Sequence, residues 1–341
     1  MYVTPRPLIS DDPLYAVRLA ATGALAYAAI PFIDPALPPV IAAFPVGLIA
    51  AQRMAFSPVK ALAGPIVFTL AVWIIGFFVE HLRVMPLVYI LMMGLTYFAG
   101  YRMILATGAP TGMLIIVVTV LLSVMGMNSI AALDSMKESF TQASLLTLLL
   151  IPLLFTILPP RTRQHFVETP VPVTGNINLG AAIRAGVLLV LSFWLYAVMP
   201  PSDMMMAVVA AMVLVFPTRH AVLSEAVQRI RATCYGGAFA LVILALFTVS
   251  PHLPVLLMLI FLCGLFFGSR MFTGKQPSMV YQYAFSVTLA LIAGALSTQE
   301  PSYATFTRIV LTLAGALSAT LLIALLDALS GWNETTLSAT S

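Results

Sequence analysis

The chain has 341 residues, of which 61% are hydrophobic and only 8% are charged. An ordinary soluble domain carries about 25% charged residues, so this composition excludes a water-soluble globule and indicates an integral membrane protein. The net charge of +4 does not indicate nucleic-acid binding, because the basic residues lie between hydrophobic segments, where they set the orientation in the membrane.

The polar N-terminal tail, residues 1–13, carries Asp11 and Asp12 where a signal peptide would have a basic region. Arg18 interrupts the first apolar run soon afterwards. A cleaved signal peptide is therefore not expected, and the first helix is predicted to stay in the mature protein.

Two series of six apolar segments follow, each segment close to the length of about 17 to 25 residues that a membrane span needs. The second segment of each series is short and contains a proline, Pro45 or Pro217, so a broken or re-entrant helix is the alternative to a crossing there. The first series lies near residues 15–33, 38–52, 59–79, 84–103, 110–127 and 136–158. After a polar linker at 159–176, the second series lies near residues 177–199, 203–216, 226–249, 253–272, 277–296 and 303–329, and a polar tail occupies 331–341.

The two series resemble each other. The sequence YFAGYRM at 97–103 returns as FFGSRM at 266–271, and Arg18 and Arg184 occupy the same place in the first segment of each series. The pair Phe44-Pro45 likewise matches Phe216-Pro217 in the second segments. We therefore expect an all-α membrane protein with twelve transmembrane helices, arranged as two parallel six-helix repeats over 14–158 and 177–330.

The positive-inside rule favours six crossings in each repeat. With the N-terminus in the cytoplasm, only Arg83, Lys137 and Arg308 of the 16 basic residues fall on the opposite side of the membrane. An even number of crossings in each half makes the repeats parallel and puts both termini in the cytoplasm.

Motifs of known catalytic chemistry are absent from the sequence. There is no GxxxxGK[ST] phosphate loop, no HExxH and no GxSxG, and the four histidines are scattered over different loops. The sequence therefore predicts neither an enzyme nor a cofactor or metal site, and energy for pumping would come from an ion gradient or another subunit.

Arginines are the first candidates for function. Arg18 and Arg184 lie several residues inside the first helix of each repeat, where a cation either snorkels to the interface or lines an anion path. Snorkelling is the simpler interpretation, and the symmetric recurrence makes an anion path a close alternative, because Arg holds a carboxylate with two charge-assisted hydrogen bonds. Arg102 and Arg270 end the fourth helices, where the positive-inside rule already explains a cation.

Polar groups of the spans and their loops provide the other candidates. Tyr281, Gln282 and Tyr283 could line a cavity suited to an aromatic acid, although such groups in spans usually bond to neighbouring helices. Asp34 and Asp203 follow the first span of each repeat and are candidate proton-exchanging carboxylates, with solvated loop acids as the alternative.

The segment RIRATCYGGA at 229–238 resembles the Arg-x-x-Gly-Thr-x-x-Gly element that opens the third span in the fusaric-acid-resistance and aromatic-acid-exporter family, with Ala232 in place of the first Gly. LYAVRLAA at 14–21 is similar to that family's first span. The resemblance covers nearly the whole chain and implies a six-helix membrane unit present twice. It also implies a periplasmic adaptor of the membrane-fusion type as a partner.

These observations favour an exporter of small organic anions, aromatic carboxylates above all, driven by protons and located in the bacterial inner membrane. A passive anion channel and a non-transporting membrane scaffold are the alternatives. The expected partners are the organic anion, the lipid bilayer and the adaptor, with no nucleic acid. The oligomeric state stays open, a homo-oligomer included.

Overall fold

The computed structural model describes residues 6–52, 54–108, 110–165, 176–198, 219–297 and 301–330. Within these ranges the chain is helical apart from turns, short connections and one isolated β-bridge between Met54 and His165. The helices are α1 (Tyr15–Ile33), α2 (Pro38–Ala50), α3 (Pro58–Leu82), α4 (Pro86–Thr107), α5 (Pro110–Asn128), α6 (Ile130–Ile157), α7 (Ile177–Val198), α9 (Arg219–Val249), α10 (Leu253–Thr273), α11 (Ser278–Ser297) and α12 (Pro301–Ser330).

Each predicted segment inside the described ranges corresponds to one of these helices, whereas the segment near 203–216 lies outside these ranges. The largest differences are at α6 and α9, which begin at Ile130 and Arg219, before the predicted starts at 136 and 226. Both extensions carry charged residues, which an apolar-run criterion excludes, although helical hydrogen bonding continues through them.

Nine helices of the described part are long and apolar enough to cross a membrane. The chain is thus an α-helical, multi-pass membrane protein. The helix α2 has 13 residues and contains Pro45, so it is about 20 Å long, less than the roughly 30 Å of a bilayer core.

Although short, α2 returns to the end at which α1 begins. The Tyr15 hydroxyl, at the start of α1, donates a hydrogen bond to the Ala50 carbonyl, at the end of α2, over 3.0 Å. This antiparallel pairing is the arrangement that a crossing second segment requires, and it supports that alternative over a segment that re-enters on one side.

The chain divides into two compact units, and each unit takes helices from both halves of the sequence. Unit 1 consists of Met1–Leu70, Ser135–Val167 and Gln228–Thr307, and unit 2 consists of Ala71–Asp134, Glu168–Val227 and Arg308–Ser341. The boundaries of the units therefore differ from the boundary between the predicted repeats.

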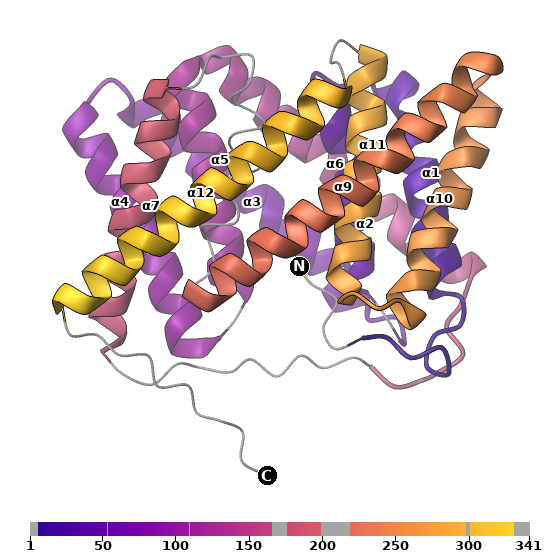
Figure 1. The fold of residues 1–341 in the computed structure, drawn as a ribbon, viewed down its shortest axis with the longest axis horizontal. Helices are drawn as coiled ribbons and strands as arrows, with labels where there is room; N and C mark the ends of the chain where they lie inside the picture. Colours follow the sequence, from indigo (N-terminus) through magenta and orange to yellow (C-terminus); the bar gives the residue numbers. More distant parts are fainter. Residues whose placement is uncertain are drawn as a thin grey trace. The chain divides into compact units, whose positions relative to one another are not determined.

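In unit 1, α1 packs along α10 and α2 packs along α11 (Figure 1). Gly264 and Gly268 of α10 face Ala20 and Ala16 of α1, and a Cβ added at either glycine would lie 2.7 or 2.9 Å from the Cα of the facing alanine. Small residues four apart allow this close approach of helix backbones. The rings of Phe44, Phe68 and Phe140 form a cluster that joins α2, α3 and α6.

In unit 2, α4 packs against both α5 and α7. Gly100 of α4 and Gly112 of α5 bring two backbones together, because a Cβ at Gly100 would lie 3.1 Å from the Gly112 carbonyl oxygen. The buried face of α4 consists of residues spaced by about one helical turn: Tyr89, Met93, Tyr97, Gly100, Tyr101 and Leu105.

Candidate functional site

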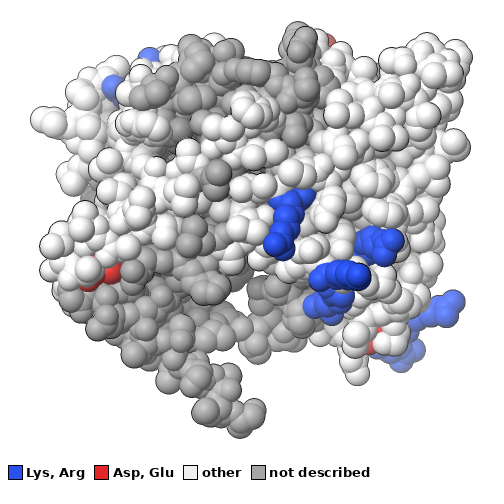
Figure 2. All heavy atoms as spheres, viewed as in Figure 1, with Lys and Arg blue, Asp and Glu red and all other residues white. Residues whose placement is uncertain are grey.

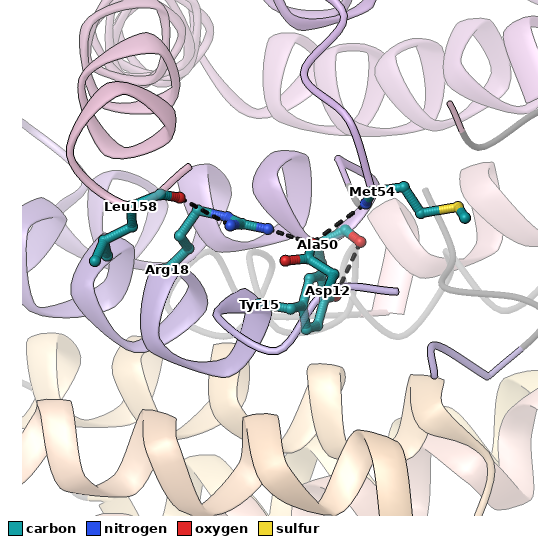
Figure 3. Close-up of polar contacts among 6 residues, drawn as sticks. All are labelled: Asp12, Tyr15, Arg18, Ala50, Met54 and Leu158. Atoms are coloured by element: carbon teal, nitrogen blue, oxygen red, sulfur yellow. Dashed lines mark hydrogen bonds and ion pairs between the residues drawn. The ribbon is translucent and has the colours of Figure 1, made fainter. Parts of the chain in front are cut away.

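Arg18 is buried in an ion pair in unit 1. Its side chain is 1% exposed and its Nη2 atom binds a carboxylate oxygen of Asp12, which is also 1% exposed (Figure 3). The Nη1 atom donates to the Leu158 carbonyl over 2.9 Å, and the Phe155 ring centroid lies 4.4 Å from the guanidinium carbon. Arg18 therefore does not snorkel to water, and the charge that it meets belongs to the protein.

The same carboxylate orders the loop after α2. The Met54 backbone N–H donates to Asp12 Oδ2 over 3.2 Å, and Met54 has a left-handed backbone with a φ of 64°. A residue with a side chain adopts that conformation only when its surroundings stabilise it. Asp12 and Arg18 thus fasten the N-terminal segment, α1, the α2–α3 loop and the end of α6 to one another.

The ion pair does not satisfy all the hydrogen-bonding atoms of Asp12 and Arg18. In the described structure the second oxygen of Asp12, Oδ1, and the Arg18 Nε atom are buried without a hydrogen-bond partner. Burial raises the pKa of the Asp12 carboxyl, whereas the Arg18 guanidinium acts in the opposite direction. The net pKa shift is upward, so the cost of burying the carboxylate outweighs the attraction of Arg18, as is common for buried ion pairs.

Arg184 has the corresponding arrangement in unit 2. It is 1% exposed, and its Nη1 atom lies 3.5 Å from Oδ1 of Asp327, which is 3% exposed and close to the end of α12. Nη1 also donates to the Gly180 carbonyl over 3.1 Å. Both predicted arginines thus meet the end of the last helix of their own predicted repeat, Leu158 after α6 and Asp327 in α12.

Arg102 and Arg270 lie on the surface at the ends of α4 and α10. The Arg270 guanidinium carbon lies 5.4 Å from the centroid of the Phe266 ring, one turn earlier in the same helix. Both positions suit contact with lipid headgroups or a solvated anion.

Tyr281, Gln282 and Tyr283 begin α11 beside a group of basic side chains. The Gln276 carbonyl accepts a hydrogen bond from Arg6 over 2.6 Å, and its side-chain oxygen accepts one from Arg231 over 2.8 Å. The Gln276 N–H donates to the Tyr281 hydroxyl over 3.2 Å.

Tyr283 lies next to a further arginine, since the Arg229 guanidinium carbon is 4.9 Å from the centroid of its ring. We call Arg6, Arg229, Arg231, Arg270 and Lys275 the basic cluster. Figure 2 shows Lys and Arg side chains gathered over α9 and the loop between α10 and α11. Guanidinium groups beside a tyrosine ring are a suitable receptor for a carboxylate on an aromatic ring.

The sequence placed Tyr281 to Tyr283 near Arg270, but it did not indicate that Arg229 lies over Tyr283 or that Arg6 and Arg231 bond to Gln276. Those contacts join residues 45 to 270 positions apart, so no local spacing could have indicated them. Gln282 is 2% exposed, and within the described structure its side-chain oxygen has no hydrogen-bond partner.

Of the two candidate proton-exchanging acids, Asp34 is exposed and Asp203 lies outside the described residues. Asp34 ends α1 with a φ of 48°, and its N–H donates to the Ile30 carbonyl. A left-handed residue that closes the last turn is a common helix ending, so Asp34 has a structural role as well. Within the described ranges, no three His, Cys, Asp or Glu side chains are grouped closely enough to hold a metal ion.

Residues 189–322 match the family model described as fusaric acid resistance protein-like. The resemblance expected from the sequence is thereby confirmed over these residues. Comparison of the chain with curated proteins and with solved structures gives no match.

The residues matched by this family model include the segment 229–238 that carried the resemblance. In the structure its small residues Ala232 and Gly236 are buried on α9. A Cβ at Gly236 would lie 2.6 Å from the Ala284 carbonyl oxygen of α11, and the Thr288 hydroxyl of α11 donates to the Gly236 carbonyl over 3.1 Å. The glycine of the motif therefore lets α9 and α11 approach, which positions Arg229 over Tyr283.

Proposed function

We propose that this protein is a bacterial inner-membrane exporter of small organic anions, with aromatic carboxylates as the substrate class. It uses the proton gradient and works with a periplasmic adaptor of the membrane-fusion type. The observation that carries the proposal is the match of residues 189–322 to the fusaric acid resistance protein-like family model in a multi-pass helical chain.

The contacts of unit 1 support this substrate class. Arg229 and Arg231 offer positive charge and directed N–H donors, and Tyr283 offers a ring face beside Arg229. By the positive-inside rule these residues lie at the cytoplasmic end, where an exporter collects its substrate. Tyr281, Gln282, Arg270 and Arg102 extend the proposed binding surface.

Arg18 and Arg184 take part in substrate binding only under one condition. Each guanidinium is occupied by an aspartate, so a substrate carboxylate reaches it only when that ion pair opens. Asp34 and Asp203 remain the proposed carboxylates that exchange protons at the outer end.

The test is the uptake of labelled phthalate by proteoliposomes that contain the full chain, with empty liposomes as the leak control. Phthalate is an aromatic dicarboxylate that crosses bare bilayers slowly at neutral pH. Arg229→Gln removes one charged hydrogen-bond donor, worth about 1.5–3 kcal/mol, so we expect the KM to rise roughly tenfold or more. The exposed Arg163 lies outside the basic cluster, and Arg163→Gln is the matched control.

Three outcomes contradict parts of the proposal. Flux that ignores an imposed pH gradient would indicate a passive channel instead. Equal KM values for the two variants would remove the basic cluster from the binding site. The absence of phthalate flux in the wild-type protein would reject transport of aromatic carboxylates.

A further inference from the structure

The Asp12 carboxylate lies among more hydrogen-bond donors than it uses (Figure 3). Arg18 Nη2 and the Met54 N–H both donate to Asp12 Oδ2. Arg18 Nε lies on the same edge of the guanidinium as Nη2, and within the described structure neither Nε nor Asp12 Oδ1 has a hydrogen-bond partner. The edge with which an arginine binds both oxygens of a carboxylate is therefore only half used.

The attachment of Asp12 to the backbone accounts for this incomplete fit. The Asp12 N–H donates to the Leu8 carbonyl over 3.3 Å, and the Asp12 carbonyl accepts a hydrogen bond from the Tyr15 N–H over 3.1 Å. These bonds fix the point from which the side chain reaches Arg18. A free carboxylate has no such tether and can turn until one oxygen meets Nη2 and the other meets Nε.

Two aromatic rings lie beside these donors. The Phe155 ring centroid is 4.4 Å from the guanidinium carbon of Arg18, and the ring centroids of Phe56 and Phe155 are 5.0 Å apart. Phe56 belongs to the α2–α3 loop, which also supplies the Met54 N–H. Aromatic rings attract one another beyond the area that they bury, so a carboxylate carried on an aromatic ring gains contacts here that a bare carboxylate lacks.

The Met54 N–H is held in place by more than Asp12. Met54 has a left-handed backbone with a φ of 64°, and it forms a β-bridge with His165. The neighbouring Ala55 N–H donates to the Gln164 carbonyl over 2.9 Å. Uncommon backbone conformations of this kind cluster at ligand sites, where the surrounding structure fixes them. The bridge gives this donor a support that does not depend on the Asp12 carboxylate.

The turn that carries Asp12 is a removable cover. Leu8 and Ile9 are 60% and 56% exposed, whereas Arg18 is 1% exposed. The N–H groups of Asp11 and Asp12 both donate to the Leu8 carbonyl, so the turn closes on itself and can leave as one piece.

The corresponding aspartate of unit 2 is placed differently. Asp327, which pairs with Arg184, lies within α12, where helical hydrogen bonds hold its backbone. Asp12 precedes α1. The arginine of unit 1 is therefore the one whose carboxylate partner can be exchanged without breaking a helix.

We propose that the Arg18 guanidinium edge, the Met54 N–H and the Phe155 ring form a binding site for an aromatic carboxylate, which Asp12 fills until the substrate displaces it. This inference rests on the proposed function for its substrate class, and it adds how the site is kept closed. The predicted topology puts the start of α1 in the cytoplasm, where an exporter collects its substrate. Exchange of one carboxylate for another leaves no buried cation unpaired, so the cover opens when an anion is present to replace Asp12.

The test is chemical rescue of the full chain in detergent, with the melting temperature as the readout. Asp12→Ala removes the built-in carboxylate and leaves Arg18 without its counter-charge, so the melting temperature should fall. Benzoate at ten times its Kd should raise it again by about 3 °C or more, because a ligand that binds only the folded state stabilises that state. Asp12→Asn, which keeps the shape of the side chain, decides the question if Asp12→Ala does not fold.

Controls locate the bound benzoate. Asp11→Ala removes the same charge one position away and keeps the ion pair, so its response should equal that of the wild-type protein, in which Asp12 competes for the site. The response of Asp12→Ala should exceed both, and the addition of Arg18→Gln should return it to the wild-type value. Benzamide, which is neutral, should give no rise, and acetate, which has no ring, should give a smaller rise than benzoate.

Failure of this site and failure of the proposed function give different results. A benzoate response in Asp12→Ala that is no larger than in the wild-type protein, or that survives Arg18→Gln, would overturn the site and leave phthalate transport unaffected. Equal responses to acetate and benzoate would overturn the aromatic specificity. Rescue by benzoate in a chain that transports no phthalate would reject the proposed export and keep the site.

Discussion

Arg18 shows how far a single residue can be interpreted from sequence. Its depth in the first helix and its recurrence as Arg184 correctly select it as unusual. The sequence offered two environments for it, lipid interface or anion path, and the structure adds an ion pair with Asp12. That partner precedes α1 and lies six positions away, so helical spacing does not indicate the contact.

We predict that removing one member of the Arg18–Asp12 pair destabilises unit 1 more than removing both. Arg18→Gln leaves the Asp12 carboxylate buried without its counter-charge, so the free energy of unfolding should fall by about 3–5 kcal/mol. Adding Asp12→Asn removes the remaining charge and should recover most of the loss. A double-mutant cycle on the melting of the detergent-solubilised protein measures this coupling.

The pH dependence has a definite sign. Burial already raises the pKa of Asp12, and loss of Arg18 raises it further because an opposing charge is gone. The destabilisation by Arg18→Gln should therefore be largest at neutral pH and shrink as acid neutralises the carboxyl. A loss that is independent of pH, or as large in the exposed control Arg161→Gln, would show that the charge pair is not its cause.

The buried tyrosines of α4 carry a signal that is visible in the sequence. Tyr89, Tyr97 and Tyr101 recur at multiples of four residues, which predicts one polar face on a span. Tyr89 and Tyr97 both bond to Ser123 of α5, and this partner could not be assigned because the sequence does not reveal which helices pack on that face.

At the scale of helices, apolar length alone predicted most elements, because a helix satisfies its backbone hydrogen bonds internally even in lipid. Which helices pair was not predictable in the same way. The contact between α1 and α10 depends on Ala16, Ala20, Gly264 and Gly268, and such small residues identify a packing face without identifying its partner.

We predict that an added methyl group destabilises the contact between α1 and α10. Gly264→Ala places a Cβ 2.7 Å from the Ala20 Cα, so α10 must move and the free energy of unfolding should fall by about 1–3 kcal/mol. Gly47→Ala in α2 is the matched control, because a Cβ there meets no atom within 4 Å. That control should gain about 0.5–1 kcal/mol from its better helix propensity.

Thermal melting of the two alanine variants under identical detergent conditions checks the difference. Equal melting temperatures would mean that α1 and α10 are not in backbone contact in the folded protein.

For the whole molecule, the predicted repeats and the compact units describe different divisions of one chain. The first helix of one predicted repeat packs with the fourth helix of the other, α1 with α10 and α7 with α4. The two pairs are equivalent under the predicted repeat, which stays a prediction. Sequence comparison of the halves detects which helices correspond, but it cannot detect that they exchange partners between units.

This exchange leads to a prediction about the separated halves. A chain cut between residues 167 and 168, where unit 1 and unit 2 also divide, gives fragments that each lack the packing partners of both their first and their fourth helix. Alone, the first fragment would keep α5 on α4 but would expose to lipid the small-residue face of α1 and the part of α4 that packs on α7. We expect each fragment expressed alone to be degraded and the two expressed together to copurify through a tag on one of them.

Because the contacts of α1 with α10 and of α4 with α7 would be restored, the paired fragments should regain the phthalate uptake of the intact chain. A stable, folded first fragment without its partner would show that each six-helix repeat is an independent folding unit and that the exchanged helix pairs contribute little to stability.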